Sequence, residues 1–204
     1  MESEKELIAR CRRGDEAAWD ALFDGYYSMA GKFIYQLSPG FQVEDIDEIC
    51  QEVFLAVVRN LEHFHGQSSF RTWLYRIAAN KARDFIDKQR AAKRGGGDIV
   101  FSLDRENPET GAKMDLPAPG LEPDLALMTE ERMSLVREAL DELGDPCREL
   151  IELRYFGDLS YDEIARELQL NVKTASSRLS KCLDKLEPIV TTLFGREKMR
   201  PSSV

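Results

Sequence analysis

Apolar residues recur with helical spacing along most of the chain, whereas runs of alternating strand residues are not evident. Ser3 and Glu6 have the spacing of a capping box and predict a short first helix that stops at Gly14. A longer helix is predicted from Asp15 to the Ser-Pro-Gly turn at 38–40. Two more are predicted over about 43–62 and 70–94. This spacing predicts a helical first domain over residues 1–94.

The periodicity is lost at "RGGGD", residues 94–98. Residues 95–128 contain "NPETG" and "PAPG" and predict a flexible acidic linker that has no core of its own. Helical spacing resumes near Thr129 and continues to about Leu186, which predicts a second domain over 129–188 and a frayed tail over 189–204. The predicted fold class is all-α, with two small helical domains joined by a flexible linker.

The stretch "SYDEIARELQLNVKTASSRLSKCL", from Ser160 to Leu183, contains two helical patterns joined by a tight turn. Ser160 with Glu163 forms a second capping box, and Asn171 is a natural N-cap for the next helix. That helix has an apolar side made of Val172, Ala175, Leu179, Cys182, Leu183 and Leu186. Its other side carries small hydroxyls and cations, namely Lys173, Thr174, Ser177 and Lys181, flanked by Arg178 and Ser180. A helix-turn-helix that places this side in a DNA major groove explains the composition; a helical hairpin with a Ser-rich exposed face is the alternative.

The helix predicted over 43–62 has an apolar face of Ile46, Ile49, Cys50, Val53, Val57 and Leu61. Its opposite face carries Glu48, Glu52, Leu55 and Arg59, with Gln51 at the flank. A leucine among charged side chains is consistent with a protein-binding patch, and equally with an ordinary solvated surface.

The helix predicted over 70–94 has an apolar side that faces the core, made of Phe70, Trp73, Leu74, Ile77 and Ala78. A different side carries a basic stripe of Arg76, Arg83, Arg90 and Arg94, together with Thr72 and Asn80. From Phe70 to Arg94 eight Lys and Arg stand against two Asp, whereas Gly95 to Thr129 has two against seven Asp and Glu. Such a basic stripe suits a phosphate backbone. The preceding loop, "FHGQSSF", is a candidate pocket for an unstacked base.

The bulk composition narrows the class of protein. A net charge of −9 over 204 residues argues against non-specific nucleic-acid binding by the whole surface. No apolar run approaches the roughly 20 residues that span a bilayer, and the N-terminus is charged, so we predict a cytoplasmic protein without membrane insertion. The four cysteines lie far apart and favour reduced, buried thiols over zinc or disulfides. No nucleophile–base pair, metal cluster or phosphate-binding loop is recognised, so we expect no enzyme activity, no metal and no cofactor.

Three motifs together resemble the extracytoplasmic-function (group IV) sigma factors of the sigma-70 family of bacterial RNA polymerase. They are "DEICQEVFLAVVRNLEHF", "GQSSFRTWLYRIAANKARDFI" and the helix-turn-helix at 160–183. The resemblance covers about residues 5–94 and 129–187. It implies that the chain directs core RNA polymerase to promoter DNA and helps to open the −10 region, and that an anti-sigma factor is a further partner.

The resemblance also implies roles for individual residues. The surface that binds core polymerase matches Glu48, Gln51, Glu52 and Leu55. The −10 region is matched by Phe64, Ser68, Ser69, Arg76, Asn80, Lys81 and Arg83, and base capture there repays the cost of unstacking. The −35 region is matched by Lys173, Thr174, Ser176, Ser177, Arg178, Ser180 and Lys181.

Three positions depart from the family pattern. Glu48 replaces the usual Asp, Ser176 replaces a usual Lys or Arg, and Cys182-Leu183 stands where a basic pair is frequent. The recognition helix is therefore less cationic than usual. Two alternatives stay open from the residues alone: a helix-turn-helix regulator that acts without entering the polymerase, and a helical protein-binding adaptor.

Overall fold

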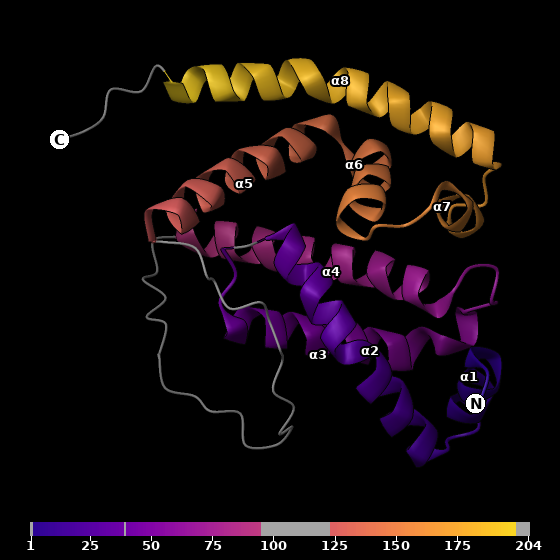
Figure 1. Cartoon of the computed structure of the whole chain (residues 1–204). Coiled ribbons are helices and arrows are strands. Elements are labelled where there is room, and N and C mark those ends of the chain that lie inside the picture. The colour runs from indigo at the N-terminus through magenta and orange to yellow at the C-terminus, as the bar shows by residue number, and fades with distance from the viewer. Residues whose placement is uncertain (1, 39, 95–122, 199–204) are drawn as a thin grey trace.

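The structure of the chain is a computed structural model that describes residues 2–38, 40–94 and 123–198. Within these ranges the regular elements are helices, as the apolar periodicity predicts. They form two groups that follow each other in sequence, and the confirmed fold class is all-α (Figure 1). Residues 95–122 of the predicted linker lie outside the described residues.

The first group contains four α-helices and one short 3-10 turn, and their bounds follow the predicted ones closely. They are α1 Glu4–Arg12, α2 Glu16–Leu37, α3 Val43–Asn60, η1 Leu61–His63 and α4 Phe70–Arg94.

Local side-chain bonds fix where the first helices begin. The Ser3 hydroxyl accepts the Glu6 N–H, while the Glu6 carboxylate accepts the Ser3 N–H at 2.9 Å, so the predicted capping box is present. The Asp15 carboxylate caps α2 by accepting the Ala18 N–H at 3.2 Å. Gly14 has a φ of +80°, a conformation that glycine adopts without strain, and it separates the two helices.

Aromatic rings hold α4 in the first domain. The Phe33 ring of α2 stacks on the Tyr75 ring with centroids 4.3 Å apart, and Phe70 is fully buried. Phe70 also meets the Phe64 and Trp73 rings, whose centroids lie 5.8 and 5.7 Å from its own. Such pairs stabilise a core beyond simple area burial.

The second group comprises α5 Pro123–Leu143, α6 Asp145–Ile151, the π-helical segment η2 Glu152–Phe156, α7 Tyr161–Glu167 and α8 Val172–Lys198. The helix α5 begins earlier than the start predicted near Thr129. It starts at a proline, which fits the first turn of a helix because the missing N–H would have no partner there.

The predicted end of the last helix is wrong. The helix α8 continues through Pro188 to Lys198, although proline removes a backbone donor and usually breaks a helix. The Thr191 and Thr192 hydroxyls donate to the carbonyl oxygens of Glu187 and Pro188, both at 2.8 Å. Leu193 is only 5% exposed, and Figure 1 shows α8 lying along α5. Tertiary burial therefore extends the helix where sequence signals favour its end.

The two helical groups pack on each other and share one apolar core. In Figure 1 the second group covers α4, and α8 forms the outermost layer on the side away from α2 and α3. At the contact a Cβ built on Gly157 would lie 3.1 Å from the Tyr75 ring and 2.8 Å from the Leu153 carbonyl oxygen. Gly157 therefore permits the close approach of η2 to α4.

Candidate functional site

The helix-turn-helix forms as the capping residues predict. The Ser160 hydroxyl accepts the Glu163 N–H, and the Glu163 carboxylate accepts the Ser160 N–H at 2.9 Å. After α7 the chain turns through Gln169, whose φ is +53°. The Asn171 side chain then accepts the Thr174 N–H at 2.7 Å and caps α8. These local bonds set the path of the chain into α8.

The first turns of α8 have one buried side and one exposed side. Ala175, Leu179 and Cys182 are buried, with Leu183 and Leu186 half-buried, as predicted. Val172 was also expected on this side but is 41% exposed, because it is the first residue of the helix and lies at its open end. The candidate −35 residues are exposed apart from the half-buried Thr174: Lys173, Ser176, Ser177, Arg178, Ser180 and Lys181.

An open hollow of about 830 Å³ lies on this exposed side of α8. Tyr161 from α7 and Lys173, Ser177 and Lys181 from α8 are among its lining residues. Hydroxyl and ammonium groups in such a hollow are suited to phosphates and base edges.

The basic stripe of α4 faces the second group of helices. Arginines of the stripe, together with Arg71 of the same helix, form ion pairs with acidic residues of α5, α6 and α7, and we name these contacts the interdomain ion pairs. They are Arg71–Glu163 at 2.9 Å, Arg76–Glu149 at 2.8 Å, Arg76–Glu167 at 3.4 Å, Arg83–Asp145 at 2.9 Å and Arg90–Asp141 at 2.7 Å. In this arrangement the guanidinium groups are paired with carboxylates, which bind them with the same charge-assisted hydrogen bonds that phosphates use.

A polar cleft of about 420 Å³ opens between α4 and α6 beside these pairs. Its lining includes Arg76, Asn80 and Arg83 from α4, and Asp145 and Glu149 from α6. The Arg83 guanidinium also donates to the Asn80 side-chain oxygen. Three of the candidate −10 residues therefore meet in one cleft at the domain contact. The side chain of Arg94, the last arginine of the predicted stripe, lies outside the described residues.

The loop before α4 differs from the predicted base pocket in one respect. Phe64 is only 6% exposed and packs against Trp73 and Phe70, so a base cannot stack on its ring in this arrangement. Ser68 and Ser69 are half-buried, and the Ser68 hydroxyl donates to the Glu167 carboxylate.

Thr72 does not share the exposed stripe of α4. Its side chain is fully buried, and its hydroxyl lies 2.8 Å from the hydroxyl of Ser69, which also accepts the Thr72 N–H. The helical-wheel angle alone misplaced it, because the loop folds over the first turn of α4 and covers that side.

The exposed face of α3 carries the candidate polymerase-binding residues Glu48, Gln51, Glu52 and Leu55. Leu55 is 47% exposed, and Val58, which was not among the predicted residues, is 56% exposed one turn further along α3. Two exposed apolar residues one helical turn apart are the signal that would have identified it. Glu52 also pairs with Lys81 of α4 at 3.3 Å, which links this face to the candidate −10 residues.

Two glutamates of the second domain have shifted pKa values. Burial raises the pKa of Glu152, although Arg148 donates to its Oε1 at 2.7 Å; its Oε2 has no partner among the described residues. Burial also opposes ionisation of Glu163, but hydrogen bonds from Ser160 and the nearby Arg71 outweigh it and lower the pKa of that carboxyl.

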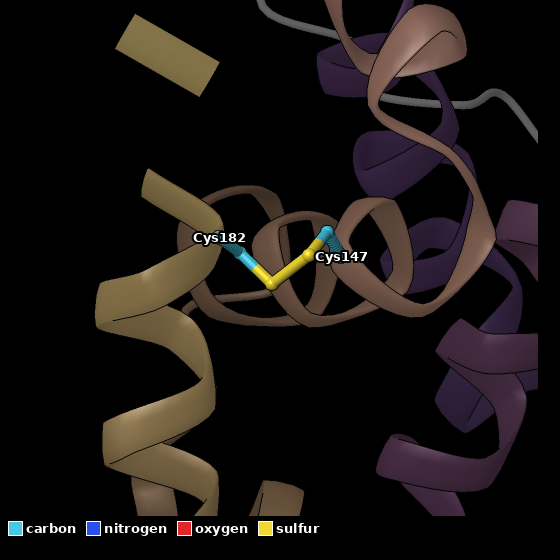
Figure 2. Close-up of a disulfide and its surroundings, with 2 residues drawn as sticks. All are labelled: Cys147 and Cys182. Carbon is cyan, nitrogen blue, oxygen red and sulfur yellow. A yellow bond between two sulfur atoms is a disulfide. The ribbon is translucent and has the colours of Figure 1, made fainter. Parts of the chain in front are cut away.

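The prediction of four reduced thiols is wrong for one pair. Cys147 of α6 and Cys182 of α8 form a disulfide, with their Cα atoms 5.2 Å apart (Figure 2). They are 35 residues apart in sequence, and only the crossing of two helices brings them together. Cys11 and Cys50 are free and buried, as predicted, and burial raises the pKa of Cys50 to about 12.

In the described part of the chain, no group of three or more His, Cys, Asp or Glu side chains is arranged to hold a metal ion. None of the described helices combines the length and apolarity of a transmembrane segment.

An exposed cationic face on the helix-turn-helix of the second domain, next to a first domain with the basic helix α4, defines a two-domain helical DNA-binding protein. The sequence profile of the ECF sigma factors matches residues 1–187, so the chain belongs to that family. This membership confirms the resemblance and the expectation of a protein that is not an enzyme. It also decides against the two alternatives, an independent regulator and a protein-binding adaptor.

Relatives match over nearly the whole chain. The ECF RNA polymerase sigma-E factor of Escherichia coli (strain K12) is 29% identical over 194 residues, which cover 95% of this chain and 97% of that protein. The protein of the same name from Haemophilus influenzae is also 29% identical over 194 residues, or 94% of this chain and 97% of that protein. Among solved structures, CnrH in complex with the cytosolic domain of CnrY matches with a TM-score of 0.53 and 22% identity, over 94% of this chain and 99% of that one. That likeness supports the fold.

Proposed function

We propose that this sigma factor works in the cytoplasm and uses three separate surfaces to start transcription. The exposed side of α8 reads the −35 element, α4 with its preceding loop holds the opened −10 region, and the exposed face of α3 binds core RNA polymerase. The three surfaces lie on different helices of the two domains, so one chain can contact polymerase and two DNA sites at once.

The exposed side of α8 is the observation that carries this proposal. Its hydroxyls are short enough to let the helix approach a major groove, and Arg178 and Lys181 reach phosphates or guanine edges. The buried side chains of Ala175 and Leu179 fix which side of the helix faces outward. The rest of the acidic surface does not compete for DNA, so contact is confined to this side.

The −10 surface needs a change of domain arrangement before it can bind DNA. Arg76 and Arg83 are paired with Glu149, Glu167 and Asp145 of the second domain, so they are not available to a DNA strand while the domains are in contact. Binding of core polymerase would separate the domains and expose α4. This order explains why an acidic chain would bind promoters weakly until polymerase is present.

Core polymerase would bind the polar-rimmed apolar patch at Leu55 and Val58, with Glu48 and Glu52 at its edge. An anti-sigma factor is the second protein partner that we propose. It is supported by the likeness in fold to CnrH, whose structure contains the cytosolic domain of CnrY.

The test is in vitro transcription with Escherichia coli core polymerase and a promoter library that is randomised upstream of the start site. We expect the transcribed templates to be enriched in two short sequence blocks at a constant spacing, with core polymerase alone as the control. The proposal is rejected if the chain selects no templates, or if it binds the same duplexes equally well without polymerase.

A further inference from the structure

We infer that the disulfide between Cys147 and Cys182 is a reversible redox site that controls how tightly α8 binds the −35 element. The inference rests on the proposed role of α8. It commits to the oxidised form as the tighter binder and to a low-molecular-weight disulfide as the class of oxidant.

The position of the disulfide links it directly to the DNA-facing side of α8. Cys182 follows Lys181 in sequence and lies one turn after Arg178, but its own side chain is 4% exposed and points toward α6. Figure 2 shows the bond bridging the two helices. The closed ring from Cys147 to Cys182 contains α7, the turn and the first turns of α8, which make up the helix-turn-helix. The bond therefore holds the reading helix against its scaffold.

Small-molecule thiols can reach this bond. The two cysteines are among the lining residues of an open groove of about 410 Å³ along α8, and Cys147 is only half-buried. Arg178, Lys181 and Lys185 line the same groove together with one carboxylate, that of Glu149. The rest of the lining is apolar and consists of Pro146, Leu150, Leu168 and Leu170. The three cations outnumber the one carboxylate, and this excess of positive charge favours the thiolate, which is the form that undergoes exchange.

The other two cysteines lack the access and reactivity that redox exchange needs. Cys11 and Cys50 are 2% and 0% exposed, and burial raises the pKa of both thiols, so they are poor nucleophiles. Disulfides in cytoplasmic proteins are usually transient or redox-sensing, because the compartment keeps thiols reduced. A permanent structural disulfide would conflict with the proposed cytoplasmic location, whereas a disulfide that forms and breaks reversibly agrees with it.

The chemistry balances as two successive thiol–disulfide exchanges. The Cys147 thiolate attacks one sulfur of an oxidised glutathione-type disulfide, whose S–S bond breaks and releases one small thiol. The Cys182 thiolate then attacks the Cys147 sulfur and releases the second small thiol. Two electrons pass to the small disulfide, and the two cysteine protons end on the two released thiols. A dithiol reductant reverses both steps.

The oxidised form binds DNA more tightly because α8 is held in place before binding. After reduction both side chains still pack as small apolar groups, so the fold persists while α8 gains freedom relative to α6. Binding must then order this part of the helix again. We expect the affinity for a −35 duplex to fall on the order of three- to tenfold, which corresponds to ordering one or two flexible side chains.

The experiment uses holoenzyme, formed from the full chain and core polymerase, and a duplex that carries the −35 block found by the transcription selection. Binding is measured after treatment with glutathione disulfide and again after dithiothreitol. Free cysteines are counted by mass spectrometry after a thiol label has been added in denaturant, because Cys11 and Cys50 are buried in the folded chain. We expect two labelled thiols in the oxidised form and four in the reduced form. Cys147→Ala and Cys182→Ala should bind like the reduced chain and ignore both treatments. The matched control, Cys11→Ala, should keep the full redox response.

Two outcomes separate failure of this inference from failure of the proposed function. Equal binding of the two redox forms to the −35 duplex, with binding lost on a scrambled −35 block, overturns the redox inference alone. Binding that ignores the −35 block in both forms overturns the role of α8 and the inference with it. Tighter binding by the reduced form also overturns the inference. So does a reduced chain whose count of free thiols does not return to two after treatment with glutathione disulfide.

Discussion

Replacement of Glu149 and Glu167 by glutamine should make the free chain bind single-stranded −10 DNA more tightly. Both carboxylates pair with Arg76, at 2.8 and 3.4 Å, and glutamine keeps their shape while removing their charge. The change lies in the second domain, so it leaves the candidate DNA-contacting residues of α4 intact. Any gain in affinity must then come from release of Arg76, or of Ser68, whose hydroxyl donates to Glu167.

The burial of the partners sets the size of the effect. The Arg76 side chain is 45% exposed, whereas those of Glu149 and Glu167 are 24% and 6% exposed. An exposed ion pair contributes about 0.2–1 kcal/mol, and a hydrogen bond to a buried charged group about 1.5–3 kcal/mol. Because nearly half of the Arg76 side chain is exposed, we expect both changes together to weaken the closed arrangement by about 1–2 kcal/mol. That shifts the open fraction, and with it the apparent affinity, by about 5- to 30-fold.

The assay is fluorescence titration of a labelled −10 strand with the free chain, in parallel with solution scattering to follow domain separation. Glu138→Gln with Glu187→Gln is the matched control, because both residues are exposed in the second domain and the net charge changes equally. An increase in radius of gyration should accompany tighter binding only in the Glu149 and Glu167 variant. The reasoning is refuted if the two double variants bind alike, since general charge would then explain the gain.

Three further predictions follow from other parts of the chain. Arg178→Ala should weaken duplex −35 binding by about 1–3 kcal/mol if the guanidinium reads a base. Asn80→Ala should leave duplex binding intact and reduce strand opening, which footprinting with a single-strand-specific probe measures. Leu55→Ala should weaken core-polymerase binding by about 1 kcal/mol or more in a titration, while Val43→Ala, also exposed on α3, should not. Burial raises the pKa of Glu152 above 4.5 in the folded chain, so its carboxyl takes up a proton more readily there than in the unfolded chain. As the pH falls from neutral toward 4.5, wild type should therefore gain stability relative to Glu152→Gln. Denaturant melts that show no such pH trend would contradict this.

Features set by neighbours in sequence could be predicted. Helices are capped by Ser3, Asp15, Ser160 and Asn171, because the turn itself brings each side chain to the N–H three residues later. The buried and exposed faces of α3 and α8 follow from helical spacing in the same way. The exposure of Lys181 on the outer side of α8 could therefore be predicted from the sequence.

Features set by contacts between distant segments could not be predicted. Nothing in the local pattern places Cys147 beside Cys182, because their contact depends on how α6 crosses α8. The same holds for Thr72, which a loop covers, and for Pro188, past which α8 continues because Leu193 is buried. The basic stripe was visible from composition, but its acidic partners lie in another domain.

The arrangement of the two proposed DNA surfaces implies an order of events. The −35 side of α8 is exposed in the closed arrangement, whereas the −10 side of α4 is paired with the domain that carries α8. Duplex DNA can thus meet α8 first, and a parted strand can meet Arg76 only after α6 moves away. The same short helix α6 carries Cys147, bonded to α8, and Glu149, paired with α4. The helix α6 is therefore held to α8 by a covalent bond and to α4 by an ion pair, and this ion pair must break before Arg76 can meet a parted strand.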